Sequence, residues 1–180
     1  MMVEPMSEVD STAVSMDATQ DLEAVFRRYA PYVGAIALRM LGNESEVDDL
    51  VQDVFIEAHR GLSSVRDPQA LRGWLARITV RVATRRLRRR RMRRWLAWGE
   101  DPDYESIADP VADTDQRALV SELYRALDRL PAADRVAWAL RQLEGETLPR
   151  VAELAGCSLA TAKRRIARAQ SVLEQEVDRG

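Results

Sequence analysis

The sequence predicts an all-α protein made of two small helical domains, joined by an acidic flexible linker, with a helix-turn-helix in the second domain. Apolar residues recur at helical spacing over most of the 180 residues, and no stretch shows the alternation of a strand. Between residues 98 and 114 this pattern is interrupted by glycine, two prolines and a run of acids, which is typical of a linker. The predicted ranges are therefore a flexible tail at 1–19, a first domain at 20–97, the linker at 98–114 and a second domain at 115–180.

Three helices are expected in the first domain. The first runs from near Asp21 to residue 41, and Pro31 should kink or divide it because proline removes a backbone donor. Gly42 and Asn43 then supply a stop and an N-cap. The second helix spans about 44–60. The third begins at Pro68, where the missing N–H costs little, and it turns its arginines mostly outward.

In the second domain, one helix begins near residue 115, and Pro131 opens another that ends before Gly145. A short helix at 147–155, a turn and a last helix that ends near residue 177 then have the spacing of a helix-turn-helix. Ser158 is a suitable N-cap for the last helix. The residues expected on its buried face are Leu159, Ala162, Ile166, Ala169 and Leu173.

The net charge of −2 conceals a sorted distribution. Arginines crowd the segment from Leu71 to Arg94, which contains no acid, and the acids follow from Glu100 to Asp115. Such dense positive charge is tolerated mainly beside a polyanion, so this segment predicts nucleic-acid binding. About six phosphate contacts would give a salt slope near −5. The candidate contacts are Arg72, Trp74, Arg77, Arg81, Arg85, Arg86 and Arg88.

Two alternatives stay open in the arginine-rich segment. Residues 88–94 are expected to supply only diffuse attraction, as a solvated continuation of the helix beyond Leu87. Trp74 has the spacing of a core residue, but a helix end, a short loop and an aromatic ring are also what is needed to hold an unstacked base.

The last helix fits the major groove of DNA, where arginine and lysine side chains bind guanine or phosphates. The alternative is an ordinary surface helix with a cationic face. The predicted contacts are Ser158, Ala160, Thr161, Lys163, Arg164, Arg165 and Arg168.

The second helix needs another kind of partner, because its acids would repel DNA. The pattern predicts a protein contact through Asp48, Asp49, Gln52 and Asp53, and the alternative is a plain solvated face.

Other function classes find no support in the sequence. The single cysteine and single histidine provide no metal-ligand spacing, and there is no nucleophile–base pair or phosphate-cradling glycine loop. We therefore expect no enzyme activity, metal or cofactor. No signal peptide and no apolar run of membrane-spanning length is visible, so a cytoplasmic protein without a membrane span is expected.

Several motifs in order resemble the extracytoplasmic-function (ECF) sigma factors of bacterial RNA polymerase, which belong to the sigma-70 family. The resemblance covers nearly all of the chain from Asp21 onward. The motifs are Phe26–Pro31, Glu46–Phe55 and Gly73–Ile78 for region two, and Leu127–Pro131, Leu143–Gly145 and Gly156–Arg168 for region four.

This resemblance implies a factor that binds core RNA polymerase, directs it to promoters and assists DNA melting, with an anti-sigma factor as a further partner. Region two would read the minus-ten element and region four the minus-thirty-five element. The acidic face would dock on the clamp helices of the largest polymerase subunit. The loop at 61–69 would capture a flipped base, and the acidic linker would thread toward the RNA exit path.

Three departures from the family pattern are present. Arg81 and Arg85 stand where many members carry Asn and Asp, and Leu71 stands where an aromatic is common, so an altered minus-ten preference is expected. Residues 147–150 lack the usual acids, which predicts a weaker cap at the first helix of the helix-turn-helix.

Two rival functions remain at this point. One is a regulator that binds DNA through the helix-turn-helix without joining polymerase. The other is a sigma-like protein that only titrates an anti-sigma factor. The regulator would leave the acidic helix and the arginine-rich helix unexplained.

Overall fold

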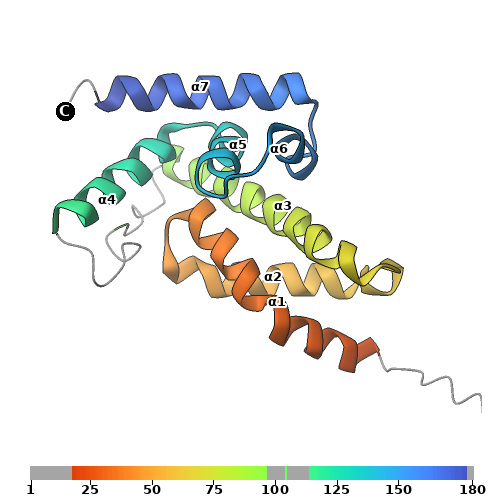
Figure 1. Ribbon diagram of the computed structural model, residues 1–180. Helices are drawn as coiled ribbons and strands as arrows, with labels where there is room; N and C mark the ends of the chain where they lie inside the picture. Colours follow the sequence, from red (N-terminus) through yellow and green to blue (C-terminus); the bar gives the residue numbers. More distant parts are fainter. Residues whose placement is uncertain (1–17, 97–103, 105–113, 178–180) are drawn as a thin grey trace, which may run out of the picture.

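A computed structural model describes residues 18–96, 104 and 114–177, and these residues form helices without any strand (Figure 1). The all-α prediction is therefore confirmed. The predicted tail lies outside the described residues up to position 17, as does the linker apart from Tyr104 and its last residue. The helices are α1 (Ala18–Leu41), η1 (Glu44–Glu46), α2 (Val47–His59), η2 (Leu62–Ser64), α3 (Pro68–Trp95), α4 (Thr114–Arg129), α5 (Ala132–Gln142), α6 (Leu148–Leu154) and α7 (Leu159–Val177).

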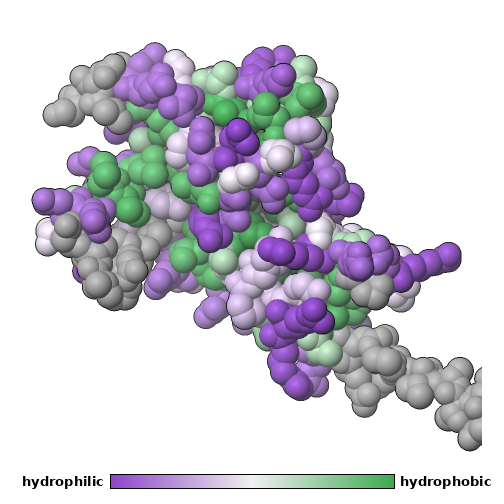
Figure 2. All heavy atoms as spheres, in the orientation of Figure 1, coloured by the Kyte–Doolittle hydropathy of each residue, from purple (hydrophilic) through white to green (hydrophobic). Residues whose placement is uncertain are grey.

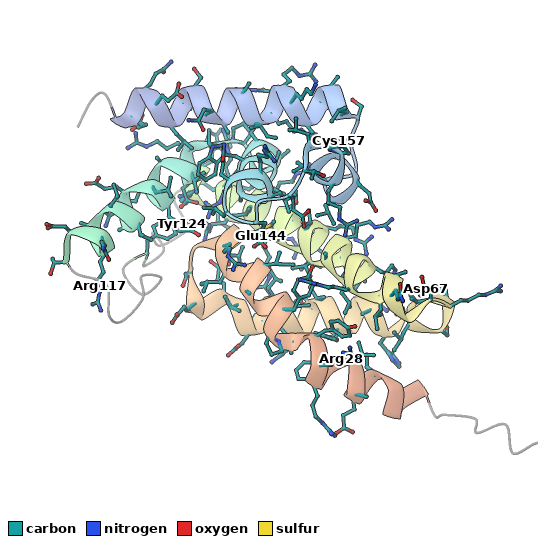
Figure 3. The ribbon with its side chains drawn as sticks, viewed as in Figure 1. Arg28, Asp67, Arg117, Tyr124, Glu144 and Cys157 are labelled. Atoms are coloured by element: carbon teal, nitrogen blue, oxygen red, sulfur yellow. The ribbon has the colours of Figure 1, made fainter. Side chains whose placement is uncertain are left out.

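The predicted start and stop signals act as expected in the first three helices. Gly42, with φ +67°, ends α1 in a conformation that glycine adopts without strain. The Asn43 side chain then accepts a hydrogen bond from the Ser45 N–H at 3.0 Å. Asp67 caps α3 by accepting from the Gln69 N–H at 2.8 Å, and it lies at the start of that helix in Figure 3.

Pro31 does not divide α1, contrary to one of the two expected outcomes. The helix continues through Pro31 to Leu41. Packing on both sides of the proline explains this result. Tyr29 precedes it and Val33 follows it, and both lie against the same apolar core, so the loss of one backbone hydrogen bond is offset.

A single apolar core joins the two predicted domains. In Figure 1, α5 and α6 lie between α7 and α3, and α1 and α2 lie beyond α3. The centre of the first domain includes Leu50, Val54 and Leu75, all with 0% exposure. The second domain adds to the same cluster Ala132, Val136, Ala137, Leu140, Val151, Ala152, Leu154 and Ala162.

A second, smaller core lies between α4, α5 and α7. It contains Leu127, Trp138 and Leu173, and Tyr104 of the predicted linker belongs to it. On the outer side of α4, Leu119 is 67% exposed. Figure 2 shows apolar side chains gathered over α4, whereas polar side chains cover most of the face around α3.

Candidate DNA and polymerase interfaces

The acidic residues of α2 lie together on its outer side. Asp48, Asp49 and Gln52 are exposed, and Asp53 is half-buried. Arg86 of α3 approaches two of them, with its Nη2 atom 2.8 Å from Asp53 Oδ2 and its Nη1 atom 4.0 Å from Asp49 Oδ2. The four residues predicted to contact a protein partner thus lie on one surface. Arg86, which is predicted to contact DNA, forms ion pairs with that surface.

The first half of α3 presents its arginines to neighbouring side chains. The Arg72 guanidinium lies 4.5 Å from the centre of the Tyr32 ring. Arg81 and Arg85 both approach Glu57 of α2, at 3.3 and 3.9 Å. These pairs are partly exposed, and such pairs contribute only about 0–1 kcal/mol each. Loss of either ion pair should therefore cost little stability.

The second half of α3 carries four exposed arginines that form no ion pair with another described residue. Among the described residues, Arg88, Arg89, Arg91 and Arg93 are exposed, and none of them forms an ion pair with another described residue. Unbalanced positive charge is therefore concentrated at 88–93. The sequence, by contrast, predicts the more specific contacts in the first half.

Trp74 connects the loop at 61–69 to the core. Its ring is half-buried and packs against the main core, and a Cβ placed on Gly61 would lie 3.0 Å from Trp74 Cζ2. Within the loop, the Ser64 hydroxyl donates to the Gly61 carbonyl at 2.6 Å. One edge of the indole thus lies against the loop, and the packing of the ring agrees with the interpretation of Trp74 as a core residue.

The helix-turn-helix is formed by α6 and α7. The Ser158 hydroxyl accepts from the Thr161 N–H at 3.2 Å, which confirms the predicted cap. Thr147 accepts from the Arg150 N–H at 3.4 Å, and this long distance agrees with the weaker cap expected for α6. Cys157 lies at the turn between the two helices in Figure 3.

The two faces of α7 largely follow the prediction. Ala162, Ala169 and Leu173 are buried and Ile166 is half-buried, but Leu159 is 43% exposed, so its predicted burial is wrong. Leu159 is the first residue of α7, and burial of this helix begins about one turn later, at Ala162. The predicted contact residues Ser158, Ala160, Lys163, Arg164 and Arg168 are exposed, and Thr161 and Arg165 are half-buried.

Arg168 has a partner within the protein. Its Nε atom lies 3.2 Å from Oδ2 of Asp134, a buried residue of α5. Arg168 therefore neutralises a buried carboxylate, whereas Lys163 and Arg164 are without an ion pair to another described residue.

Neither a candidate metal site nor a candidate membrane-spanning helix occurs among the residues that the structure describes. No group of three or more potential metal-ligating side chains occurs in the ranges 18–96, 104 and 114–177. No helix within the same ranges has both the length and the apolar character needed to cross a membrane.

Comparison with known proteins matches this arrangement to one family. Residues 25–93 match sigma-70 region 2, and residues 121–170 match sigma-70 region 4. The ECF RNA polymerase sigma factor SigE of Mycolicibacterium smegmatis is 35% identical over 95% of this chain and 69% of its own length. The chain belongs to the ECF RNA polymerase sigma factors. Its function is accordingly to direct RNA polymerase in transcription initiation.

Further relatives agree with the assignment of this sigma factor. The ECF RNA polymerase sigma-E factor of Haemophilus influenzae is 31% identical over 83% of this chain and 84% of its own. The sigma factor RpoE, solved with the anti-sigma factor NepR from Bartonella quintana, has the same fold (TM-score 0.65, 22% identity, 88% and 98% of the two chains). CnrH, solved with the cytosolic domain of CnrY, superimposes with a TM-score of 0.58 at 26% identity over 89% of each chain.

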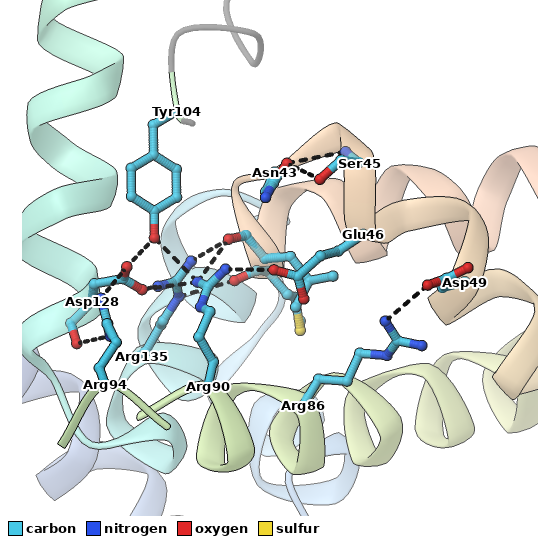
Figure 4. A network of polar contacts seen from close by, with 12 residues as sticks. Asn43, Ser45, Glu46, Asp49, Arg86, Arg90, Arg94, Tyr104, Asp128 and Arg135 are labelled. Carbon is cyan, nitrogen blue, oxygen red and sulfur yellow. Dashed lines mark hydrogen bonds and ion pairs between the residues drawn. The ribbon is translucent and has the colours of Figure 1, made fainter. Parts of the chain in front are cut away.

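A buried ionic network joins regions 2 and 4 of the sigma factor (Figure 4). Its centre is Asp128 of α4, whose side chain is 5% exposed. Asp128 accepts from Arg90 at 2.8 Å, from Arg94 at 2.6 Å, and also from Arg135 of α5 and the Tyr104 hydroxyl. We call these five residues the Asp128 network.

The network also caps the end of α1. Arg135 donates to the Met40 carbonyl at 2.9 Å and to the Leu41 carbonyl at 2.7 Å, and Arg90 donates to the Leu41 carbonyl at 3.1 Å. The last carbonyls of a helix lack partners within the helix, and positive charge there is favourable. Side chains of α3 and α5 therefore meet on the C-terminus of α1.

Electrostatics keep Asp128 ionised. Burial alone would raise the pKa of its carboxyl group, but the charges of Arg135 and Arg90 outweigh burial, and the pKa lies below its ordinary value. Burial raises the pKa of the Tyr104 hydroxyl to about 12, so Tyr104 donates to Asp128 at neutral pH. The network is thus a carboxylate held by cations and a neutral phenol.

The expectation for the end of α3 is therefore wrong at two positions. Residues 88–94 were predicted to supply only diffuse attraction, but Arg90 is 5% exposed and Arg94 is half-buried, and both bind Asp128. The helix twist turns these two inward while Arg91 and Arg93 face solvent. Two features of the sequence point to this network. Tyr104 lies inside an acidic segment, and Asp128 precedes Arg135 by seven residues.

Proposed function

We propose that this sigma factor binds core RNA polymerase through the acidic face of α2 and promoter DNA through α3 and α7, without covalent chemistry of its own. The observation that carries this proposal is the separation of charge between surfaces. Exposed acids gather on α2, and exposed cations that form no ion pair with another described residue gather on the second half of α3 and at Lys163 and Arg164 of α7. Such surfaces suit two partners of opposite charge.

Region 2 is proposed to hold the opened minus-ten element. Arg88, Arg89, Arg91 and Arg93 supply exposed positive charge for backbone phosphates. The loop at 61–69, supported by Trp74, is proposed to receive a flipped base. Binding free energy would then offset an unstacking cost of a few kcal/mol.

Region 4 is proposed to read the minus-thirty-five element with the first turns of α7. Ala160, Lys163 and Arg164 are exposed there, and a recognition helix contacts base edges with its N-terminal residues. Arg168 lies about one turn later and is held by Asp134, so we assign it to orientation of α7 and to phosphate contact.

An anti-sigma factor is the third proposed partner. Two solved relatives of the same fold, RpoE and CnrH, are complexes, the first with the anti-sigma factor NepR and the second with the cytosolic domain of CnrY. We place the protein in the cytoplasm, where polymerase and DNA are found.

Reversal of charge on α2 tests the polymerase contact. The double variant Asp49→Lys, Asp53→Lys should lose stoichiometric capture of core polymerase, because the acidic face would then carry positive charge. The matched control is Asp115→Lys, Glu122→Lys, which makes the same charge change at two exposed positions of α4. Circular dichroism confirms that each variant is folded.

Transcription provides the second readout. Wild type and the control should support specific run-off transcription with core polymerase on the upstream region of the protein's own gene, and the α2 variant should not. Equal capture of polymerase by both double variants would contradict the proposed face. Binding of the template without any binding of polymerase would favour the helix-turn-helix regulator instead.

A further inference from the structure

A cationic groove of about 450 Å³ lies between the end of α3 and α4. Four arginines line it, together with Trp95, Tyr104 and Asp128. Pockets of about 300–1,000 Å³ hold small ligands and cofactors in other proteins. The groove is therefore large enough for one small ligand.

The two helices present their side chains to this groove at matching intervals. Arg91 and Trp95 lie four residues apart on α3, and Arg125 and Arg129 lie four residues apart on α4. Residues at this spacing share one face of a helix. An arginine and a tryptophan of α3 therefore lie across the groove from two arginines of α4.

Positive charge in the groove exceeds negative charge. Asp128 is the one acid among the described lining residues, and the Asp128 network already binds it to three arginines (Figure 4). Arg129 is paired with Glu176, whereas Arg91 and Arg125 are exposed and form no ion pair with another described residue. Two guanidinium groups, one on each helix, are therefore available for an anion.

Trp95 supplies an aromatic surface beside these charges. It is 81% exposed, more than any other large apolar residue in the described part of the chain. Packing therefore does not account for a tryptophan at this position. Bases stack on exposed aromatic rings, and arginines bind phosphates through charge-assisted hydrogen bonds. A flat base and a chain of phosphates together make up a nucleoside polyphosphate.

We propose that the groove binds a nucleoside polyphosphate, with its base stacked on Trp95 and its phosphates held between Arg91 and Arg125. The size of the groove favours a free nucleotide over a nucleic-acid strand. Arginines also approach the groove from two helices, whereas a strand needs an open track along the surface. The site requires both α3 and α4, so it belongs to the full chain.

Arg91 then has two competing ligands. It is one of the exposed arginines proposed to bind promoter phosphates, so the nucleotide and DNA compete for the same guanidinium group. This consequence rests on the proposed function, whereas the nucleotide site itself does not. A rise in nucleotide concentration therefore weakens DNA binding by the free sigma factor.

Isothermal titration calorimetry on the full chain tests the site with three probes, GTP, guanosine and inorganic tripolyphosphate, at low ionic strength. Wild type should bind GTP more tightly than either of the others, because GTP engages both the indole and the arginines. Trp95→Leu should raise the Kd of GTP about tenfold and leave the Kd of tripolyphosphate within about twofold, because stacking involves only the base. Arg125→Gln should raise both Kd values about tenfold.

Arg60→Gln is the matched control for Arg125→Gln. Arg60 is an exposed arginine at the end of α2 that forms no ion pair with another described residue and does not line the groove. The Kd of GTP should stay within about twofold of wild type in this control, because salt screens a distant exposed charge. All three substituted positions are exposed, and circular dichroism checks that each variant is folded.

Competition with DNA is measured by fluorescence anisotropy of a labelled duplex. GTP should displace the duplex from wild type and should displace it less from Trp95→Leu, whose binding to the duplex alone should equal that of wild type. If no variant binds the duplex while the GTP titrations follow the expected pattern, the proposed function fails and the nucleotide site stands.

Three results would overturn the nucleotide site. The first is an absence of GTP binding to wild type at millimolar concentration, and the second is an equal effect of Arg60→Gln and Arg125→Gln. The third is equal binding of GTP and tripolyphosphate, both unaffected by Trp95→Leu, which would reduce the groove to a site for any polyanion. Binding of a single-stranded oligonucleotide that depends on Trp95 and Arg125, without binding of GTP, would replace the free nucleotide with a nucleic-acid strand.

Discussion

Asp128 shows how one residue can support both folding and the relation between two regions. Its carboxylate is buried, yet it accepts hydrogen bonds from three arginines and a tyrosine. Removal of one partner from such a group is expected to cost about 3–5 kcal/mol, because the remaining charges stay buried without compensation. At the exposed pairs of α3, by contrast, single substitutions should cost little stability, and their effects should appear in DNA binding.

The depressed pKa of Asp128 predicts a stability that depends on pH. The group is more acidic when folded than when unfolded, so its contribution is present above the ordinary carboxyl pKa near 3.9 and is lost as pH falls through the lower folded value. Urea denaturation between pH 7 and pH 3 should therefore show a fall in the free energy of unfolding at the acidic end. The groups facing the carboxylate are Arg90, Arg94, Arg135 and Tyr104.

The comparison variant is Asp128→Asn, which should be less stable than wild type at pH 7 and should show a shallower fall toward pH 3. If the free energy of unfolding falls equally steeply with pH in the two proteins, other carboxylates cause the loss of stability in acid.

At the scale of elements, the 28-residue helix α3 buries one side in the core and carries closely spaced arginines on its other sides. Its apolar side, with Leu75, Ile78, Val82 and Leu87, is buried in the main core, and its other sides carry arginines. Mutual repulsion among those arginines disfavours an isolated helix. Packing of the apolar side and the ion pairs with α2, α4 and α6 therefore maintain helical structure as far as Trp95.

Truncation of the apolar side of α3 measures that dependence. Leu75→Ala removes a side chain with 0% exposure and should lower the free energy of unfolding by about 2–5 kcal/mol. Leu119→Ala makes the same change at a 67% exposed position of α4 and should stay within about 0.5 kcal/mol of wild type. Similar losses for the two variants in urea denaturation would place α3 outside the cooperative core.

At the scale of the whole molecule, regions 2 and 4 behave as one packed unit in this structure. The end of α1 is one place where they meet. Arg135 and Arg90 cap its carbonyls, and the Tyr124 hydroxyl donates to the Arg39 carbonyl at 3.1 Å. In Figure 3, Tyr124 projects from α4 toward this junction. A substitution at the end of α1 should therefore affect the packing of both regions.

Gly42 permits this close contact, and a matched pair of substitutions tests it. A Cβ on Gly42 would lie 2.1 Å from the Tyr124 ring, whereas a Cβ on Gly145 would meet nothing within 4 Å, although both glycines have positive φ. Each Gly→Ala change should cost about 1–2 kcal/mol in backbone strain. Gly42→Ala should cost about 1–3 kcal/mol more through overpacking, as measured by urea denaturation.

A double-mutant cycle with Tyr124→Leu identifies the source of the difference. The extra cost of Gly42→Ala should shrink when the ring is absent. Equal costs for the two glycine variants in the wild-type background would show that Tyr124 moves aside freely.

The sequence by itself determined the local structure and the family of this protein. Caps such as Asn43, Asp67 and Ser158 act through neighbours two or three residues away, so their residue types are sufficient to predict where helices begin. Apolar spacing likewise identified the helices and most of the buried face of α7. The ordered motifs indicated an ECF sigma factor, and the matches to sigma-70 regions 2 and 4 and the similarity to ECF sigma factors confirm that identity.

Only the tertiary structure decided which arginines are free and how the two regions meet. Arg90 and Asp128 are 38 residues apart, and arginines occur both in contact with water and beside a carboxylate that is distant in sequence, so local pattern does not distinguish Arg90 from exposed Arg91. The partners of Arg77 and Arg90 were set by the packing of α5 and α6 against α1 and α3. Charge density predicted a DNA-binding helix, and long-range packing determined which of its charges remain available.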